Sequence, residues 1–70
     1  MPVITWEGGA LTTQQKKELI LRLSNTAAEI TNVPLRFHTV LIREQPDENL
    51  GTAGESVAEL KARLAQEKSK

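Results

Sequence analysis

The second residue of the chain is the first candidate for chemistry. Removal of Met1 would leave Pro2 with a free secondary amine, a group that no other position can supply. An α-amino group titrates near the physiological range, and apolar surroundings lower its pKa because they disfavour the cation. A neutral amine at pH 7 can take a proton from one carbon and return it to another, which is general acid–base catalysis with one group. We expect Trp6, Phe37 and Leu50 to supply the apolar surroundings.

Few other residues could meet a charged substrate near Pro2. His38 is the only histidine, and strand alternation puts it on the face of Val40, where a structural imidazole is the simpler interpretation. Arg36 lies close to that end, and Arg43 lies further along the same segment. For both arginines the alternative interpretation is a solvated or interface charge.

Four carboxylates gather around one predicted loop, at Glu44, Asp47, Glu48 and Glu55. The chain has no Cys and only one His, so these residues do not form a recognisable metal site. We interpret them as loop and helix-start charges, and we expect neither a metal nor a cofactor.

The composition limits the class of protein. Seventy residues make one small domain, predicted over 1–70, whose single core supplies only ~3–5 kcal/mol of net stability. With no Cys for disulfides, oligomerisation is the remaining means of stabilisation. Nine basic and nine acidic residues cancel without a basic stripe, which argues against nucleic acid, and no apolar run is long enough to suggest a membrane span or signal peptide. We therefore expect a cytoplasmic protein.

The elements that would position Pro2 follow from local patterns. A β-branched and aromatic segment predicts a strand over about 2–7, stopped by two glycines. The sequence TTQQ at 12–15 has the form of a helix capping box, and apolar residues at 19, 23, 27 and 30 then recur on one helical face. Asn32 and Pro34 end this helix, which covers about 13–31.

The second half of the chain contains shorter elements. The segment FHTVLIRE predicts a strand over 37–44, and the glycine-rich stretch 49–54 indicates a loop or a short hairpin. Residues Val57, Leu60 and Leu64 form an apolar stripe, which with a Glu59–Arg63 pair predicts a helix over about 55–67.

A strand, a helix and a strand in this order form a βαβ unit with parallel strands. The predicted fold class is therefore α/β, in the broad sense that includes α+β, with a parallel two-stranded sheet in each protomer. Both faces of the second strand carry apolar residues, whereas one helix can cover only one face. We expect another subunit to cover the second face.

Five short segments, in this order and spacing, carry a resemblance to a known family. They are PVI at 2–4, QQKKELI at 14–20, PL at 34–35, VLIRE at 40–44 and ENLGTAGE at 48–55. The chain resembles the tautomerase superfamily, specifically the short 4-oxalocrotonate (2-hydroxymuconate) tautomerase type. The resemblance covers nearly the whole chain but not the segment from about Val57 onwards.

The resemblance implies a β-α-β protomer that assembles into a hexamer, with a trimer or dimer as alternatives. It also implies that Pro2 is the catalytic base and that arginines bind the carboxylate of an unsaturated 2-keto or 2-hydroxy acid. This chain has Leu11 and Thr39 where the best-known members carry arginines, and Leu50 where they carry an aromatic wall. Weak activity on dicarboxylates follows from this loss of charge.

Geometry predicts how these substrate-binding positions are shared. Leu11 follows the far end of the first strand, about 16 Å from Pro2. We therefore expect a site that combines Pro2 with Leu11, Thr39 and Leu50 from several chains, with Arg36 and His38 as replacement cations.

Three functions remain open from the sequence. The first is an isomerase that uses Pro2 for keto–enol tautomerisation of a small acid or enol. The second is a non-catalytic oligomer that keeps the fold for binding or structural purposes. The third is a hydratase, dehalogenase or decarboxylase of the same superfamily.

Overall fold

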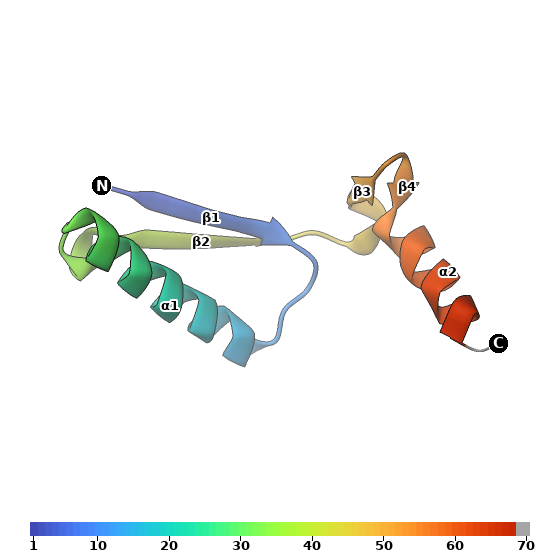
Figure 1. Cartoon of the computed structure of the whole chain (residues 1–70), viewed down its shortest axis with the longest axis horizontal. Coiled ribbons are helices and arrows are strands. Elements are labelled where there is room, and N and C mark those ends of the chain that lie inside the picture. The colour runs from blue at the N-terminus through green and yellow to red at the C-terminus, as the bar shows by residue number, and fades with distance from the viewer. Residues whose placement is uncertain (69–70) are drawn as a thin grey trace.

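The chain folds as a strand, a helix and a strand, followed by a small hairpin and a second helix (Figure 1). The computed structural model describes residues 1–68. The elements in chain order are β1 Val3–Gly8, α1 Thr13–Thr31, the 3-10 turn η1 Leu35–Phe37, β2 Thr39–Glu44, the 3-10 turn η2 Asp47–Asn49, β3 Gly51–Thr52, β4 Glu55–Ser56 and α2 Val57–Lys68.

Strands β1 and β2 are parallel, which confirms the predicted βαβ unit. Their register pairs Val3 with Thr39 at one end and Gly8 with Glu44 at the other. Beyond the last pair at the first end, the Thr39 amide donates a hydrogen bond of 3.0 Å to the Pro2 carbonyl. Pro2 is therefore held at the start of the sheet, beside the first residue of β2.

Helix α1 begins and ends where the sequence predicts. The Gln15 amide donates to Thr12 Oγ1 at 3.1 Å, and the Thr12 amide donates to Gln15 Oε1 at 2.9 Å, which completes the capping box. At the other end Asn32 adopts a left-handed conformation with φ of 61°, and its amide donates to the Ala28 carbonyl.

The second strand begins two residues later than predicted. The amides of Phe37 and His38 donate to the carbonyls of Pro34 and Leu35, so residues 35–37 form a 3-10 turn instead of extended chain. The prediction that Phe37 belongs to the strand is wrong, because Pro34 starts a turn whose hydrogen bonds occupy the next amides. Phe37 consequently leaves the sheet.

The glycine-rich segment forms the hairpin, and the helix after it starts at Val57 instead of residue 55. Ala53 and Gly54 both have positive φ, at 55° and 83°, as a two-residue turn of type I′ requires. The predicted Glu59–Arg63 pair is wrong. Glu59 instead accepts from the amide and hydroxyl of Ser56, a second capping box at the start of α2.

Arg63 binds the hairpin instead. Its guanidinium donates to both carboxylate oxygens of Glu55, at 2.9 and 3.2 Å, and lies 3.8 Å from Glu67. The hydrogen bonds to Glu55 raise the pKa of Arg63. On the neighbouring turn Lys61 lies 2.8 Å from Asp47. These contacts attach α2 to the segment before it.

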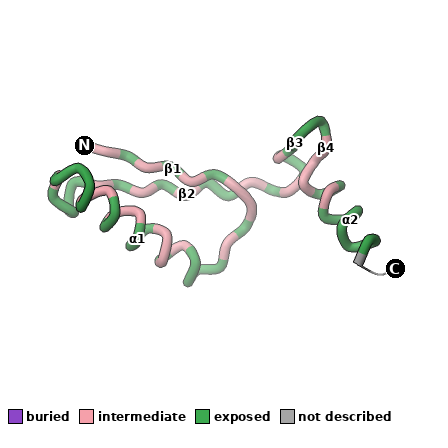
Figure 2. The backbone as a smooth tube through the Cα atoms, in the orientation of Figure 1, coloured by how far each residue is buried: buried purple, intermediate pink, exposed green. Residues whose placement is uncertain are grey.

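The chain has no enclosed core among its described residues (Figure 2). Helix α1 half-buries the sheet face that carries Ile4, Trp6, Val40 and Ile42, whereas Val3 on the other face remains 62% exposed. Ile30, predicted to pack with the apolar stripe of α1, is 75% exposed because two strands are too narrow to cover the whole stripe.

The overall dimensions agree with the absence of an enclosed core. The accessible surface is 5531 Å², against about 4,300 Å² for a compact monomer of this mass. The radius of gyration is 16.3 Å, against about 11 Å for a compact chain of this length. No helix in residues 1–68 is long and apolar enough to cross a membrane.

Candidate functional site

Pro2 lies in an open, apolar hollow at the first end of the sheet. Met1, Pro2, Val33 and Phe37 line this hollow, whose volume is about 360 Å³. Met1 is 88% exposed, and its peptide bond leaves the Pro2 nitrogen as a tertiary amide that cannot accept a proton. Cleavage after Met1 would turn that nitrogen into an amine inside an apolar hollow.

Arg36 does not line this hollow but contacts Phe37, one of its walls. Its guanidinium carbon lies 4.5 Å from the centroid of the Phe37 ring, and that ring is one wall of the hollow. No carboxylate of the described residues pairs with Arg36. The 3-10 turn that removes Phe37 from β2 therefore brings an aromatic wall and a cation to the Pro2 end together.

His38 joins the end of the α1 segment to the start of β2. Its Nε2 lies 3.1 Å from the Val33 carbonyl, which can only accept, so Nε2 carries the proton of this hydrogen bond. Nδ1 is closed off from solvent and has no hydrogen-bond partner. This contact is the one expected of a structural imidazole, and a role in substrate binding stays a prediction.

Thr39 lies beside Pro2 but turns to the open face of the sheet, where it is exposed with Val3 and Leu41. Its side chain carries no charge, so this position offers a hydroxyl where the sequence resemblance leads one to expect a guanidinium. The Pro2 end of one protomer thus combines Pro2, Arg36, His38 and Thr39.

The structure does not bring Leu11 or Leu50 to this end. Leu11 follows the far end of β1, and Leu50 lies just before the hairpin on the opposite side of the molecule from the N-terminus (Figure 1). Trp6, predicted near Pro2, pairs in register with Ile42 towards the far end and lines a different hollow there, together with residues of α1. Of the three predicted apolar neighbours, only Phe37 lies against Pro2 in this protomer.

The loop that carries Leu11 has a fixed position. The Leu11 amide donates to Glu44 Oε2 at 3.0 Å, and Lys16 Nζ lies 2.6 Å from Glu44 Oε1. The hydrogen bond from Lys16, followed by that from the Leu11 amide, lowers the pKa of Glu44. Glu44 therefore links the loop, α1 and the end of β2.

A second hollow, of about 530 Å³, lies at this far end between Trp6, Leu11 and the first half of α1. Its charged residues, Glu18 and Arg22, pair with each other at 2.7 Å. The one carboxylate among the lining residues, Glu18, is engaged in this ion pair, so we assign no catalytic role to this hollow.

Sequence reasoning missed Val33 as a wall of the Pro2 hollow and missed the stacking of Arg36 on Phe37. The only signal for the stacking is the adjacency of Arg36 and Phe37 after a proline, which does not by itself fix a turn. Three of the four carboxylates around the predicted loop, at 44, 47 and 55, have basic partners, in keeping with structural charges.

Residues 3–60 match the family model described as "Tautomerase enzyme". An apo structure of an unfused 4-OT is 34% identical, with a TM-score of 0.80 over 83% of this chain and 97% of its own. DmpI from Archaeoglobus fulgidus is 38% identical, with a TM-score of 0.78 over 81% of this chain and 98% of its own.

A third solved structure is TomN, a 4-oxalocrotonate tautomerase homologue in the tomaymycin biosynthetic pathway. It is 29% identical, with a TM-score of 0.84 over 87% of this chain and 95% of its own. No curated protein matches the sequence. The family match ends at residue 60, at the end of the first turn of α2, so the remainder of that helix lies outside it.

Proposed function

Because this chain belongs to the tautomerase family, within its 4-oxalocrotonate tautomerase-like members, we propose that it is an isomerase whose general acid and base is Pro2. The proposal requires removal of Met1, whose exposed side chain leaves it accessible. The substrate class is an unsaturated 2-keto or 2-hydroxy acid, or a related enol.

The observation that carries the proposal is the position of Pro2 in an apolar hollow on a fixed backbone. Val33 and Phe37 line the hollow, and the Thr39 amide holds the Pro2 carbonyl. Apolar walls disfavour the ammonium form, so the free amine would be available as a base at neutral pH. The amine would take the proton of an enol hydroxyl, and the resulting ammonium would return a proton to carbon as the carbonyl forms.

A complete site needs more than one copy of the chain. Leu11 and Leu50 lie far from Pro2 within the protomer, and one sheet face remains open. We propose a homo-oligomer, a hexamer with a trimer or dimer as alternatives, in which neighbouring chains bring these residues to Pro2. The same contacts would cover the open face of the sheet.

We propose weak activity on dicarboxylates. Leu11 and Thr39 cannot form the bidentate, charge-assisted hydrogen bonds that an arginine makes with a carboxylate. A monocarboxylate or an apolar enol suits the Pro2 end better, since the hollow is lined by apolar side chains.

Two measurements test the function. Intact-mass spectrometry should show a chain that lacks Met1, since a retained methionine would leave no amine at Pro2. Ultraviolet assays with phenylenolpyruvate and 2-hydroxymuconate should then show that Pro2→Ala lowers kcat by about 100-fold or more. Pro46→Ala, at the distant turn η2, is the matched control. A Pro2→Ala variant with the full rate would exclude the proline mechanism.

A further inference from the structure

We propose that Arg36, stacked on Phe37, binds the carboxylate of a ligand whose apolar body occupies the Pro2 hollow. The binding site stands on its own geometry, and its effect on turnover rests on the proposed function. The ligand class is a monocarboxylate with an aryl or branched apolar tail.

Four of the seven Lys and Arg side chains described in residues 1–67 already have a carboxylate partner. The pairs are Lys16 with Glu44, Arg22 with Glu18, Lys61 with Asp47, and Arg63 with Glu55 and Glu67. Among the side chains described in residues 1–67, no ion pair involves Lys17, Arg36 or Arg43. These three are the cations that remain available for an anionic ligand.

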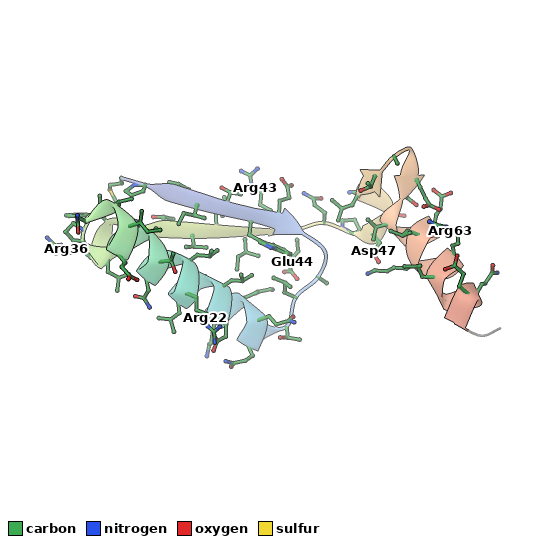
Figure 3. The ribbon with its side chains drawn as sticks, in the orientation of Figure 1. Arg22, Arg36, Arg43, Glu44, Asp47 and Arg63 are labelled. Carbon is green, nitrogen blue, oxygen red and sulfur yellow. The ribbon has the colours of Figure 1, made fainter. Side chains whose placement is uncertain are left out.

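The three unpaired cations lie at different places in the molecule (Figure 3). Arg43 pairs in register with Glu7 towards the far end of the sheet, and Lys17 lies in the first half of α1 at that same end. Arg36 lies at the same end of the molecule as the N-terminus, next to the start of both strands. Among the described side chains of this chain it is the one unpaired cation at the Pro2 end.

Stacking prepares Arg36 for a carboxylate. The guanidinium carbon lies over the Phe37 ring, 4.5 Å from its centroid, and no hydrogen bond or ion pair shown by the described residues uses the guanidinium N–H groups, which are free to donate. A guanidinium held in this way loses less side-chain freedom on binding than a mobile one, and its paired N–H groups match the two oxygens of a carboxylate.

The lining of the Pro2 hollow determines which chemical group can form the body of the ligand. Its lining residues, Met1, Pro2, Val33 and Phe37, are apolar, so they favour a hydrocarbon or aromatic body over a second charge. Loss of Met1 would widen the hollow at the Pro2 nitrogen. A carboxylate on Arg36 would thus place the apolar part of the molecule across the Phe37 wall, towards Pro2.

Calorimetric titration of the Met1-free protein with trans-cinnamate and with its neutral amide tests the binding site. Wild type should bind cinnamate, Arg36→Ala should raise its Kd at least tenfold, and Arg36→Lys should recover part of the loss. Arg36→Ala should leave the Kd of the neutral amide unchanged. The control Arg43→Ala should bind cinnamate with the wild-type Kd. An unchanged Kd in Arg36→Ala, an equal loss of both ligands, or no binding to wild type would overturn the proposal.

Steady-state kinetics distinguish the carboxylate-binding role of Arg36 from the proposed function of Pro2. With phenylenolpyruvate, Arg36→Ala should raise KM at least tenfold with kcat within about threefold of wild type. With the methyl ester of the same enol, KM should not change. Full activity in Pro2→Ala would refute the catalytic proline and leave the cinnamate result valid, whereas an unchanged KM in Arg36→Ala would refute the carboxylate role and leave the proline mechanism valid.

Discussion

The amide of Thr39 donates a hydrogen bond to the carbonyl of Pro2, at 3.0 Å. The first residue of β2 is thereby tied by its backbone to the proposed base, while its side chain points to the open face of the sheet. A change of the Thr39 side chain can therefore alter what lies near Pro2 without moving the backbone that holds it.

Thr39→Arg should increase activity on dicarboxylates. The substitution would add a guanidinium next to the proposed base, and we expect kcat/KM for 2-hydroxymuconate to rise about tenfold, the effect of one added charge-assisted contact. Thr39→Gln, with a long side chain but no charge, is the control. An equal gain in both variants, or none in Thr39→Arg, would contradict the prediction.

Leu41→Lys should weaken assembly. Leu41 lies on the open sheet face and is 39% exposed, so a lysine there would put a charge into the proposed contact between copies. Sedimentation velocity should show a shift from the oligomer to smaller or unfolded species. Asn25→Lys adds the same charge at an exposed position of α1 and should sediment as wild type. An intact Leu41→Lys oligomer would place the interface elsewhere.

Acid should loosen the Leu11 loop. The folded-state pKa of Glu44 lies below its ordinary value of 4.5, so the stabilising effect of its ionised form is complete above about pH 4.5 and is lost as the pH falls through the folded value. Glu44→Gln should lower the urea midpoint relative to wild type at pH 6. Between pH 6 and pH 3.5, its midpoint should fall by less than that of wild type.

Glu48→Gln is the control for the acid experiment, because no hydrogen bond or ion pair shown by the described residues involves Glu48. Its urea midpoint should follow that of wild type at both pH values. Equal midpoints for Glu44→Gln and wild type across this range would show that Glu44 does not stabilise the loop.

Ala53→Gly should stabilise the protein. Ala53 has a φ of 55°, a conformation that costs a residue with Cβ about 1 kcal/mol and costs glycine almost nothing. We expect urea unfolding to show a gain of about 0.5–1 kcal/mol. Ala62→Gly, in the exposed middle of α2, should destabilise by a similar amount. A loss of stability in both variants would mean that the turn is not strained at Ala53.

The sequence was most informative where local chemistry decides the structure. The Thr12 capping box and the left-handed cap at Asn32 place both ends of α1, because each depends on hydrogen bonds between near neighbours. The parallel direction of the strands, which puts Pro2 at the same end as the start of β2, follows from the βαβ order of the elements. These features sufficed to locate the Pro2 end of the candidate site.

Prediction failed where several partners compete for one group. Arg63 has Glu59 and Glu67 one turn away on α2, and Glu55 of β4 is also within reach. Spacing alone does not show that Ser56 occupies Glu59. Phe37 fits a strand pattern, but the turn after Pro34 withdraws it. The separation of Leu11 from Pro2 was predicted from the length of the first strand, whereas that of Leu50 depends on the path of the whole chain and not on local pattern.

The absence of an enclosed core among residues 1–68 bears on how the protein behaves at different abundances. If burial is completed by other copies, folding and association form one equilibrium, and the free energy of unfolding grows with total protein concentration. A newly synthesised chain would then stay vulnerable to proteolysis until it meets its partners. Expression level would in this way set not only how much protein is present but what fraction of it is folded.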